Sequence, residues 1–159
     1  MIKLFERNFK EIKFDIAQYQ LNLLPLDNFS SFGVKIDGNY FQTAEHAFQY
    51  LKFNDEYPEI ANKIKAAFSP NEARDIAQKY KHLKPKNWSD VKYANMEKIF
   101  EAKSKQNPIV RDVLIATKDY LIIEFCIDED TDWGVDANKE GQNNLGKIWM
   151  KVRDNTISI

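Results

Sequence analysis

The spacing of apolar and polar residues along the chain predicts an α+β fold, dominated by helices, with a small β-sheet. Apolar positions alternate over residues 34–36, Asp37-Gly38 supplies the positive φ of a tight turn, and apolar residues return at 40–41. This pattern predicts a short hairpin. The best candidate for a buried strand is the apolar run over residues 121–127.

Helix signals occupy most of the remaining chain. Thr43 is a candidate N-cap, and Ser69-Pro70-Asn71-Glu72 combines an N-cap, a proline at the first helical position and a reciprocal glutamate. Asn107-Pro108 ends one helix and begins another. The predicted helices cover residues 44–54, 58–68, 70 onward, 88–105, 108–116 and 145–153. Residues 128–144 form a long acidic loop with glycines, and a loop of that length is usually functional.

The size of the chain fits one domain over residues 1–159, of which residues 1–24 are an N-terminal extension whose spacing leaves open a helix, a strand pair or both. With 43% hydrophobic residues, a domain of this length buries about 68–70% of its unfolded surface. The single cysteine, Cys126, excludes an intramolecular disulfide framework, and no apolar run is long enough to span a membrane. We therefore expect a soluble cytoplasmic protein with no membrane partner.

Charge limits the partners. The formal net charge is −1, so no long-range field attracts the chain to nucleic acid, and any such contact must be local. Only four of the 23 basic residues are arginines, which leaves few guanidinium groups for reading bases. This composition therefore disfavours a protein that reads DNA sequence.

One face of the predicted helix after Thr43 is polar. At about 100° per residue, Glu45, Gln49 and Lys52 fall within a sector of about 60°. Glu45 and Lys52 lie two turns apart, about 10.5 Å along the axis, which leaves room for a small group between their tips. The helix N-terminus favours the ionised form of Glu45. The alternative is an ordinary solvated stripe on an amphipathic helix.

Metal ligands are scarce. His46 has only His82 as a second histidine, so a His/Cys metal site is not expected, and we interpret His46 as a packing residue. The acidic residues at 128–136 lack the spacing of an EF-hand and are expected to act as hydrogen-bonding groups, Asp130 among them. We expect neither a metal nor a cofactor.

Two further segments have candidate binding residues. The late loop carries Trp133, which could stack on a base, and Gly134, Asn143 and Gly146, which suit close backbone approach or a helix cap. Ordinary turns and caps use the same residues. Asn28, ahead of the predicted hairpin, either holds a sugar or forms a turn.

Taken together, these segments resemble the NADAR (YbiA-like) family. Its Ser-Asn-Phe element is similar to Asn28-Phe29, and its pattern Thr-x-Glu-His-x-Phe-Gln-x-x-Lys-Phe matches residues 43–53. Its Trp-Gly loop ends in Gly-x-Asn-x-Leu-Gly, which resembles Trp133-Gly134 followed by residues 141–146. The likeness covers roughly residues 25–154, and the Glu-His-x-Phe-Gln block is its specific part.

The resemblance implies an N-glycosidase that cleaves ribose from an amine nitrogen, with Glu45 and Lys52 as catalytic residues. A desolvated lysine can capture C1 of the ribose as a Schiff base while Glu45 moves protons; the alternative is an oxocarbenium ion with Glu45 activating water. Trp133 and Phe29 would clamp the base, and the backbone of residues 143–146 would bind phosphate. The residues expected to bind substrate are Asn28, Phe29, Gln49, Asp130, Trp133, Gly134, Asn143 and Gly146.

Known family activities are hydrolysis of amino-pyrimidine intermediates of riboflavin synthesis and removal of ADP-ribose from guanine in nucleic acid, the latter as antidote to DarT-type toxins. The chain has Asp27 where serine is usual and Asp136 where glycine is frequent, and it lacks the Phe-Tyr signature of riboflavin-type members. The missing signature favours ADP-ribosylated nucleic acid as substrate and a cognate toxin as partner. The net charge favours a ribosylamino-pyrimidine phosphate. A non-catalytic ADP-ribose-binding module is a third alternative, which the presence of both Glu45 and Lys52 disfavours.

Overall fold

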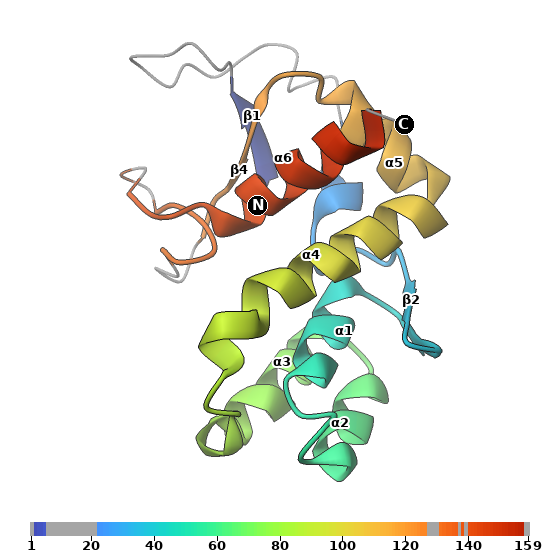
Figure 1. The fold of residues 1–159 in the computed structure, drawn as a ribbon, viewed down its shortest axis with the longest axis vertical. Coiled ribbons are helices and arrows are strands. Elements are labelled where there is room, and N and C mark those ends of the chain that lie inside the picture. Colours follow the sequence, from blue (N-terminus) through green and yellow to red (C-terminus); the bar gives the residue numbers. More distant parts are fainter. Residues whose placement is uncertain (1, 6–21, 127–130, 137, 139, 158–159) are drawn as a thin grey trace. The chain divides into compact units, whose positions relative to one another are not determined.

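The computed structural model describes residues 2–5, 22–126, 131–136, 138 and 140–157, with only the backbone given at 3–5. The chain forms two compact units, one of residues 28–107 and one that combines the chain up to residue 27 with residues 108–159 (Figure 1). The first unit contains β2 (Val34–Ile36), β3 (Asn39–Phe41), α1 (Ala44–Leu51), α2 (Pro58–Lys65), α3 (Pro70–Lys79), the 3-10 turn η3 (Lys81–Leu83) and α4 (Trp88–Gln106). The second contains β1 (Ile2–Phe5), the 3-10 turn η2 (Leu24–Leu26), α5 (Pro108–Ala116), β4 (Leu121–Glu124) and α6 (Asn144–Ile157).

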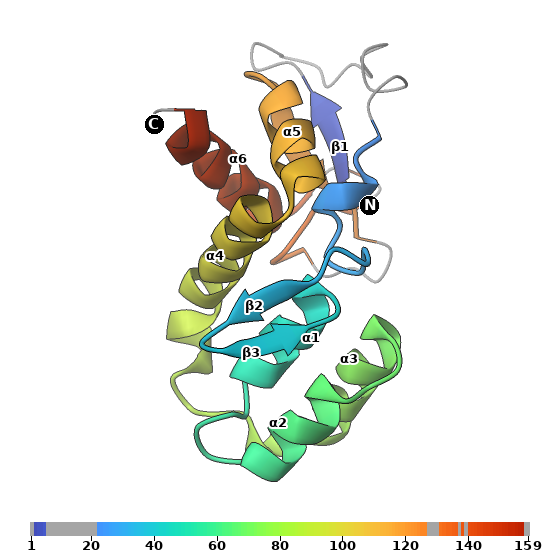
Figure 2. The same ribbon diagram turned by 90° about the vertical axis from the view of Figure 1, so that its right-hand side faces the viewer.

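The helix-dominated α+β class is confirmed, and so is the hairpin at residues 34–41. Strands β2 and β3 pair antiparallel with Val34 opposite Phe41, and Asp37 and Gly38 form the turn with φ of 48° and 81°. Figure 2 shows the hairpin beside α1, which both of its strands contact. Among helices that consist of described residues, none is long and apolar enough to cross a bilayer.

Helix starts in the first unit follow the predicted caps. The Thr43 hydroxyl accepts a hydrogen bond from the backbone N–H of His46, and the Ser69 hydroxyl accepts one from the backbone N–H of Glu72. The predicted helix ends were too late, because α1 ends at Leu51 and α2 at Lys65. After Leu51 the chain tightens into turns that lead to Pro58, and a residue before proline is disfavoured in helical conformation.

Helices α2 and α3 of this unit share an apolar core, against which Tyr50 of α1 packs, and the three helices are seen together in Figure 2. Burial of this surface drives the helices together and fixes the rotation of each about its axis. Since one side of α1 is held in this way, the orientation of its other side is fixed as well. The core is formed by Phe53, Ile60, Ala61, Ile64, Ala67, Ala73 and Ala77.

The second unit is built on a strand pair that the sequence did not predict. Strand β1, in the segment left open above, pairs antiparallel with β4, with Ile2 opposite Glu124. The strand expected over residues 121–127 begins as predicted but ends at Glu124, and Phe125 then bridges to Val135. Helix α6 packs on β4 and is longer than the predicted 145–153.

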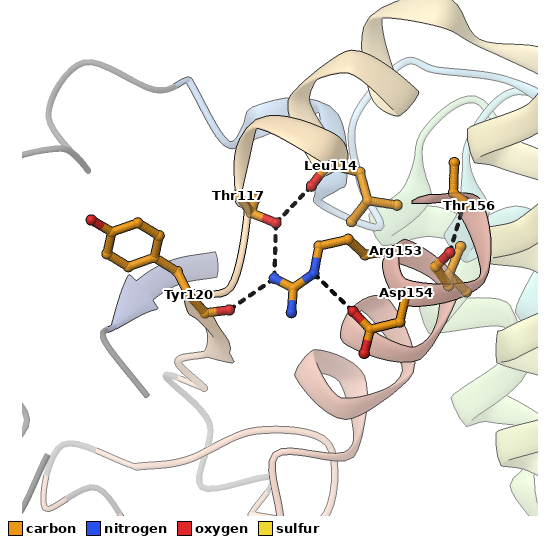
Figure 3. A network of polar contacts seen from close by, with 7 residues as sticks. Leu114, Thr117, Tyr120, Arg153, Asp154 and Thr156 are labelled. Carbon is orange, nitrogen blue, oxygen red and sulfur yellow. Dashed lines mark hydrogen bonds and ion pairs between the residues drawn. The ribbon is translucent and has the colours of Figure 1, made fainter. Parts of the chain in front are cut away.

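A buried arginine holds α6 to the turn between α5 and β4 (Figure 3). One terminal nitrogen of Arg153 donates hydrogen bonds to the Thr117 hydroxyl at 3.0 Å and to the carbonyl of Tyr120 at 2.8 Å. Its Nε lies 3.3 Å from a carboxylate oxygen of Asp154, and Thr117 donates to the carbonyl of Leu114. The guanidinium therefore donates to two acceptors of this turn, a side-chain hydroxyl and a backbone carbonyl.

Candidate functional site

Helix α1 presents the predicted polar face, and this face is mostly buried. Glu45 is 6% exposed, Gln49 is 7% exposed, and Lys52, at the C-cap, is half-buried. Burial of a carboxyl and an amide is costly unless hydrogen bonds compensate. The alternative of an ordinary solvated stripe is therefore wrong, and the structure brings the three side chains together.

Gln49 links the carboxylate to the amine. Its Nε2 donates to Oε1 of Glu45 at 2.7 Å, and its Oε1 accepts from Nζ of Lys52 at 2.7 Å. The expectation of open room between the tips of Glu45 and Lys52 was wrong, because the Gln49 amide occupies that gap. The three groups form one hydrogen-bonded chain along the helix, and a substrate has to approach it from the side.

The amine of Lys52 is in an environment that favours its neutral form. Burial, the largest effect, lowers the pKa of Lys52 to about 8; Glu45 opposes this shift, and the charges of Lys84 and Lys92 add to it. Nζ also lies 5.5 Å from the ring of Trp88. With this pKa about a tenth of the amine is unprotonated at pH 7, so it is available as a nucleophile.

The segment that contains Asn28 lies against the start of α1. The backbone N–H of Glu45 donates to the carbonyl of Asn28 at 3.1 Å, and Ser30 accepts a hydrogen bond from the fully buried amine of Lys103 at 3.0 Å. The side-chain oxygen of Asn28 is buried and has no hydrogen-bond partner among the residues that the structure describes. A buried acceptor without a donor is unfavourable, so this oxygen is suited to accept a hydrogen bond from a ligand.

Phe29 has a cationic neighbour that sequence reasoning missed. The guanidinium carbon of Arg74, on α3, lies 5.4 Å from the centre of the Phe29 ring. Arg74 is exposed and Phe29 half-buried. No local pattern indicates this pair, because the two residues are joined only by the packing of α3 near the start of α1.

His46 is a packing residue, as interpreted from the sequence. It is fully buried, its Nδ1 lies 2.8 Å from the Thr43 hydroxyl, and its Nε2 lies 3.1 Å from the carbonyl of Ala67. Both ring nitrogens are thus used to join the start of α1 to the α2–α3 loop. Within the described residues, His, Cys, Asp and Glu form no group of three that could hold a metal ion.

The late loop belongs to the other unit, where its predicted binding residues have structural contacts. Asn143 adopts a φ of 49°, accepts from the backbone N–H of Glu124 and donates to the carbonyl of Ile122. A Cβ at Gly146 would lie 2.1 Å from that same carbonyl, and one at Gly134 would lie 2.4 Å from the sulfur of Cys126. Asn143 and Gly146 therefore hold the start of α6 against β4.

The backbone of this loop is also engaged. The N–H groups of Asn143, Asn144 and Leu145 donate to the carbonyls of Gly134, Asp132 and Trp133. These three donors have partners within the protein, so phosphate binding by residues 143–146 stays a prediction. Trp133 is half-buried, and its clamping of a base together with Phe29 also stays a prediction. The predicted binding residue Asp130 lies outside the described residues.

Glu124 is a second carboxyl in an unusual environment. Burial on β4 raises its pKa above the ordinary value, and the charge of Asp27 adds to the effect. In the sequence, Glu124 is a single acidic residue within the apolar run over residues 121–127, which gives no sign of this environment. Its environment depends on packing between segments far apart in the chain.

Comparison with known proteins places this geometry in context. The model of the NADAR domain matches residues 7–156, and so includes both units. The chain is 35% identical to N-glycosidase YbiA of Shigella flexneri serotype 5b over 127 residues, 80% of this chain and 78% of the relative. It is 29% identical over 129 residues to riboflavin biosynthesis protein VVA0006 of Vibrio vulnificus, covering 81% of this chain and 34% of that protein. The NMR structure of the E. coli protein YbiA matches with a TM-score of 0.75 and 31% identity, over 84% of this chain and 78% of that one.

Proposed function

We propose that this chain, which belongs to the NADAR domain family and is an N-glycosidase of the hydrolase class, removes ADP-ribose from guanine modified in nucleic acid. One observation carries the proposal: a hydrogen-bonded chain joins the buried carboxyl of Glu45, through Gln49, to an amine with a lowered pKa on Lys52. An acid/base group beside a nucleophilic amine suits cleavage of a ribosyl amine.

The chemistry begins on an exocyclic amine nitrogen bound to C1 of the ribose. Opening of the ring C1–O bond, with a proton taken up by the ring oxygen, gives an iminium ion, and the neutral amine of Lys52 adds to C1 and gives up a proton. The bond from C1 to the guanine nitrogen then breaks, with a proton delivered to the departing amine by way of Glu45. Water adds to the resulting Schiff base, and cleavage of its C1–N bond returns the lysine amine and releases ADP-ribose. One water molecule is consumed.

The pair formed by Phe29 and Arg74 supports a large substrate. An aromatic face offers stacking for a base, and the guanidinium offers charge-assisted hydrogen bonds to phosphate. Asn28 adds a buried acceptor for a hydroxyl group. ADP-ribose contains all three kinds of group, a base, phosphates and ribose hydroxyls.

A second substrate is favoured by a specific observation. The Vibrio vulnificus relative is named a riboflavin biosynthesis protein, and this chain spans about a third of its length. A phosphoribosylamino-pyrimidine also joins ribose to an exocyclic amine, so the same Glu45 and Lys52 chemistry applies to it. We rank this substrate second.

Incubating the protein separately with an ADP-ribosyl-guanine oligonucleotide and with the pyrimidine intermediate tests the ranking. Release of ADP-ribose from the oligonucleotide alone supports the proposal. Release of ribose phosphate from the pyrimidine intermediate alone reverses the ranking of the two substrates. Tight ADP-ribose binding without release from either substrate would indicate a non-catalytic reader. Lys52→Arg is the matched control, because it keeps a positive charge but removes the nucleophilic amine.

The proposed partner is a DarT-type toxin whose modification of DNA this enzyme reverses. Co-expression with such a toxin should restore bacterial growth for the wild-type chain but not for Lys52→Arg. Equal rescue by both would mean that the chain acts without catalysis, for example by binding the toxin.

A further inference from the structure

A hollow of about 550 Å³ lies within the first unit, outside the residues assigned to catalysis. It is formed where the segment before α2, the turn η3 and the start of α4 meet. Its lining includes Glu56, His82, Lys84, Lys86 and Asn87. The volume is within the range of about 300–1,000 Å³ that small-molecule sites have. Its lining is polar, unlike that of most such sites, so it suits a charged group better than an apolar one.

The charge of the hollow is mainly positive. Lys84 and Lys86 each bring an ammonium group, His82 brings a further nitrogen donor, and Glu56 is the acidic residue among its lining groups. The whole chain, by contrast, has a formal net charge of −1. Positive charge is therefore concentrated locally, and an anion is the ligand that such a lining recognises.

The residues that line the hollow include neighbours in the chain of the groups that surround Lys52, and one of them, Lys84, acts on its amine through its charge. Asn87 in its lining precedes Trp88, whose ring lies 5.5 Å from Nζ of Lys52. The charge of Lys84 is close enough to that amine to contribute to its lowered pKa. On its other side the lining includes Glu56, only four residues after Lys52. A ligand held in the hollow would thus present a neighbouring part of itself to Lys52.

We infer that this hollow binds the phosphate on C5 of the substrate's ribose, with Lys84 and Lys86 as its main ligands, while C1 of the same ribose meets Lys52. The inference rests on the proposed function, because it assumes that a ribosyl amine reacts at Lys52. It assigns the anchoring of the reacting sugar to two lysines in the short segment between η3 and α4. Both a ribose 5-phosphate group and the diphosphate of ADP-ribose contain a phosphate on that carbon.

Binding of small probes tests this inference without turnover. Dissociation constants of ribose 5-phosphate, ribose and ADP-ribose would be measured by calorimetry for the wild type and for Lys84→Ala, Lys86→Ala and Lys81→Ala. Lys81 is the matched control, because it is an exposed lysine at the start of η3, just before Lys84 and Lys86 in the chain, and does not line the hollow. We expect ribose 5-phosphate to bind at least about tenfold more tightly than ribose, since a phosphate adds charge-assisted hydrogen bonds.

The substitutions Lys84→Ala and Lys86→Ala should each weaken the binding of ribose 5-phosphate about five- to tenfold. Lys81→Ala should change its dissociation constant less than about twofold. An equal loss of affinity for ADP-ribose would show that the hollow accepts a diphosphate. A loss of affinity for ribose 5-phosphate alone would show that it takes a phosphate monoester. The inference would be overturned if Lys84→Ala and Lys86→Ala left the dissociation constants of both ligands unchanged, or if Lys81→Ala lost as much affinity as they do. Turnover of the oligonucleotide by the wild type, measured in parallel, distinguishes failure of the hollow from failure of the proposed function.

Discussion

At the scale of single residues, Lys52 is the group whose surroundings most determine the chemistry. Burial and the charges of Lys84 and Lys92 disfavour its protonated form, while the charge of Glu45 favours it. Its hydrogen bond to Gln49 holds the amine in one direction. A residue that must act as a nucleophile near neutral pH needs this combination of a lowered pKa and a fixed position.

The pH dependence of turnover should therefore follow the titration of Lys52. Below its pKa of about 8 the amine gains a proton and loses its nucleophilic form. We expect kcat/KM to rise about tenfold per pH unit below pH 8 and to level off above it, because kcat/KM reports the pKa values of the free enzyme. A pH-rate profile from pH 5.5 to 9.5 measures this, and a rate independent of pH over that range would contradict it.

Glu45→Gln should separate catalysis from binding. The substitution keeps the size and hydrogen-bonding capacity of the side chain but removes its ability to carry protons. We expect turnover to fall about 10²- to 10⁴-fold while ADP-ribose still binds within a few-fold of wild type. Steady-state kinetics and calorimetry measure the two quantities, and a loss of binding as large as the loss of turnover would indicate a purely structural role.

Sequence alone predicted part of this site, for a clear reason. Helical periodicity puts Glu45, Gln49 and Lys52 on one face whatever the rest of the chain does. It did not predict that Gln49 would bridge the other two, because that depends on rotamers set by packing. Arg74 beside Phe29 also depends on contacts between separate segments and was missed.

At the scale of elements, α1 is the frame of the candidate site. Its start is fixed by the Thr43 cap and by His46, and its apolar side is buried against α2 and α3. Caps and periodic patterns are local, so the helix starts were predicted well. Pairing of β1 with β4 joins segments more than a hundred residues apart, and no local pattern indicates it.

A charge added to α1 next to Lys52 should shift the titration that controls catalysis. Gln49→Glu places a carboxylate where the amide oxygen now accepts from Lys52. A neighbouring negative charge favours the protonated amine, so we expect the midpoint of the pH-rate profile to move upward by about one pH unit or more. Gln49→Met, which adds no charge, is the control. An equal upward shift in both variants would contradict an electrostatic cause.

At the scale of the whole molecule, each of the two units has its own means of stability. The first relies on an apolar core of helices, and the second includes the buried guanidinium of Arg153 (Figure 3). In the sequence, the unit of residues 28–107 is a single segment that interrupts the other unit, which is made of the chain before and after it. Sequence composition showed enough apolar residues for an ordinary core but gave no sign of this division.

Arg153→Ala should destabilise the protein without touching the residues assigned to catalysis. It leaves the carbonyl of Tyr120 and the hydroxyl of Thr117 without their donor and opens a cavity, so we expect a loss of about 2–4 kcal/mol in the free energy of unfolding. Arg111→Ala is the matched control, since its ion pair with Asp112 is exposed and worth at most about 1 kcal/mol. Urea unfolding measures both, and equal losses would contradict a special role for Arg153.

Trapping of the covalent intermediate tests the central claim most directly. The wild-type protein would be incubated with ADP-ribosyl-guanine oligonucleotide in the presence of borohydride, which reduces a Schiff base to a stable amine, and the adduct would be mapped by mass spectrometry of peptides. We expect one adduct on Lys52, with the added mass of ADP-ribose less one oxygen atom because condensation loses water and reduction adds two hydrogens, and none in Lys52→Arg. An adduct on another lysine, or turnover at the normal rate with nothing trapped, would contradict nucleophilic catalysis by Lys52.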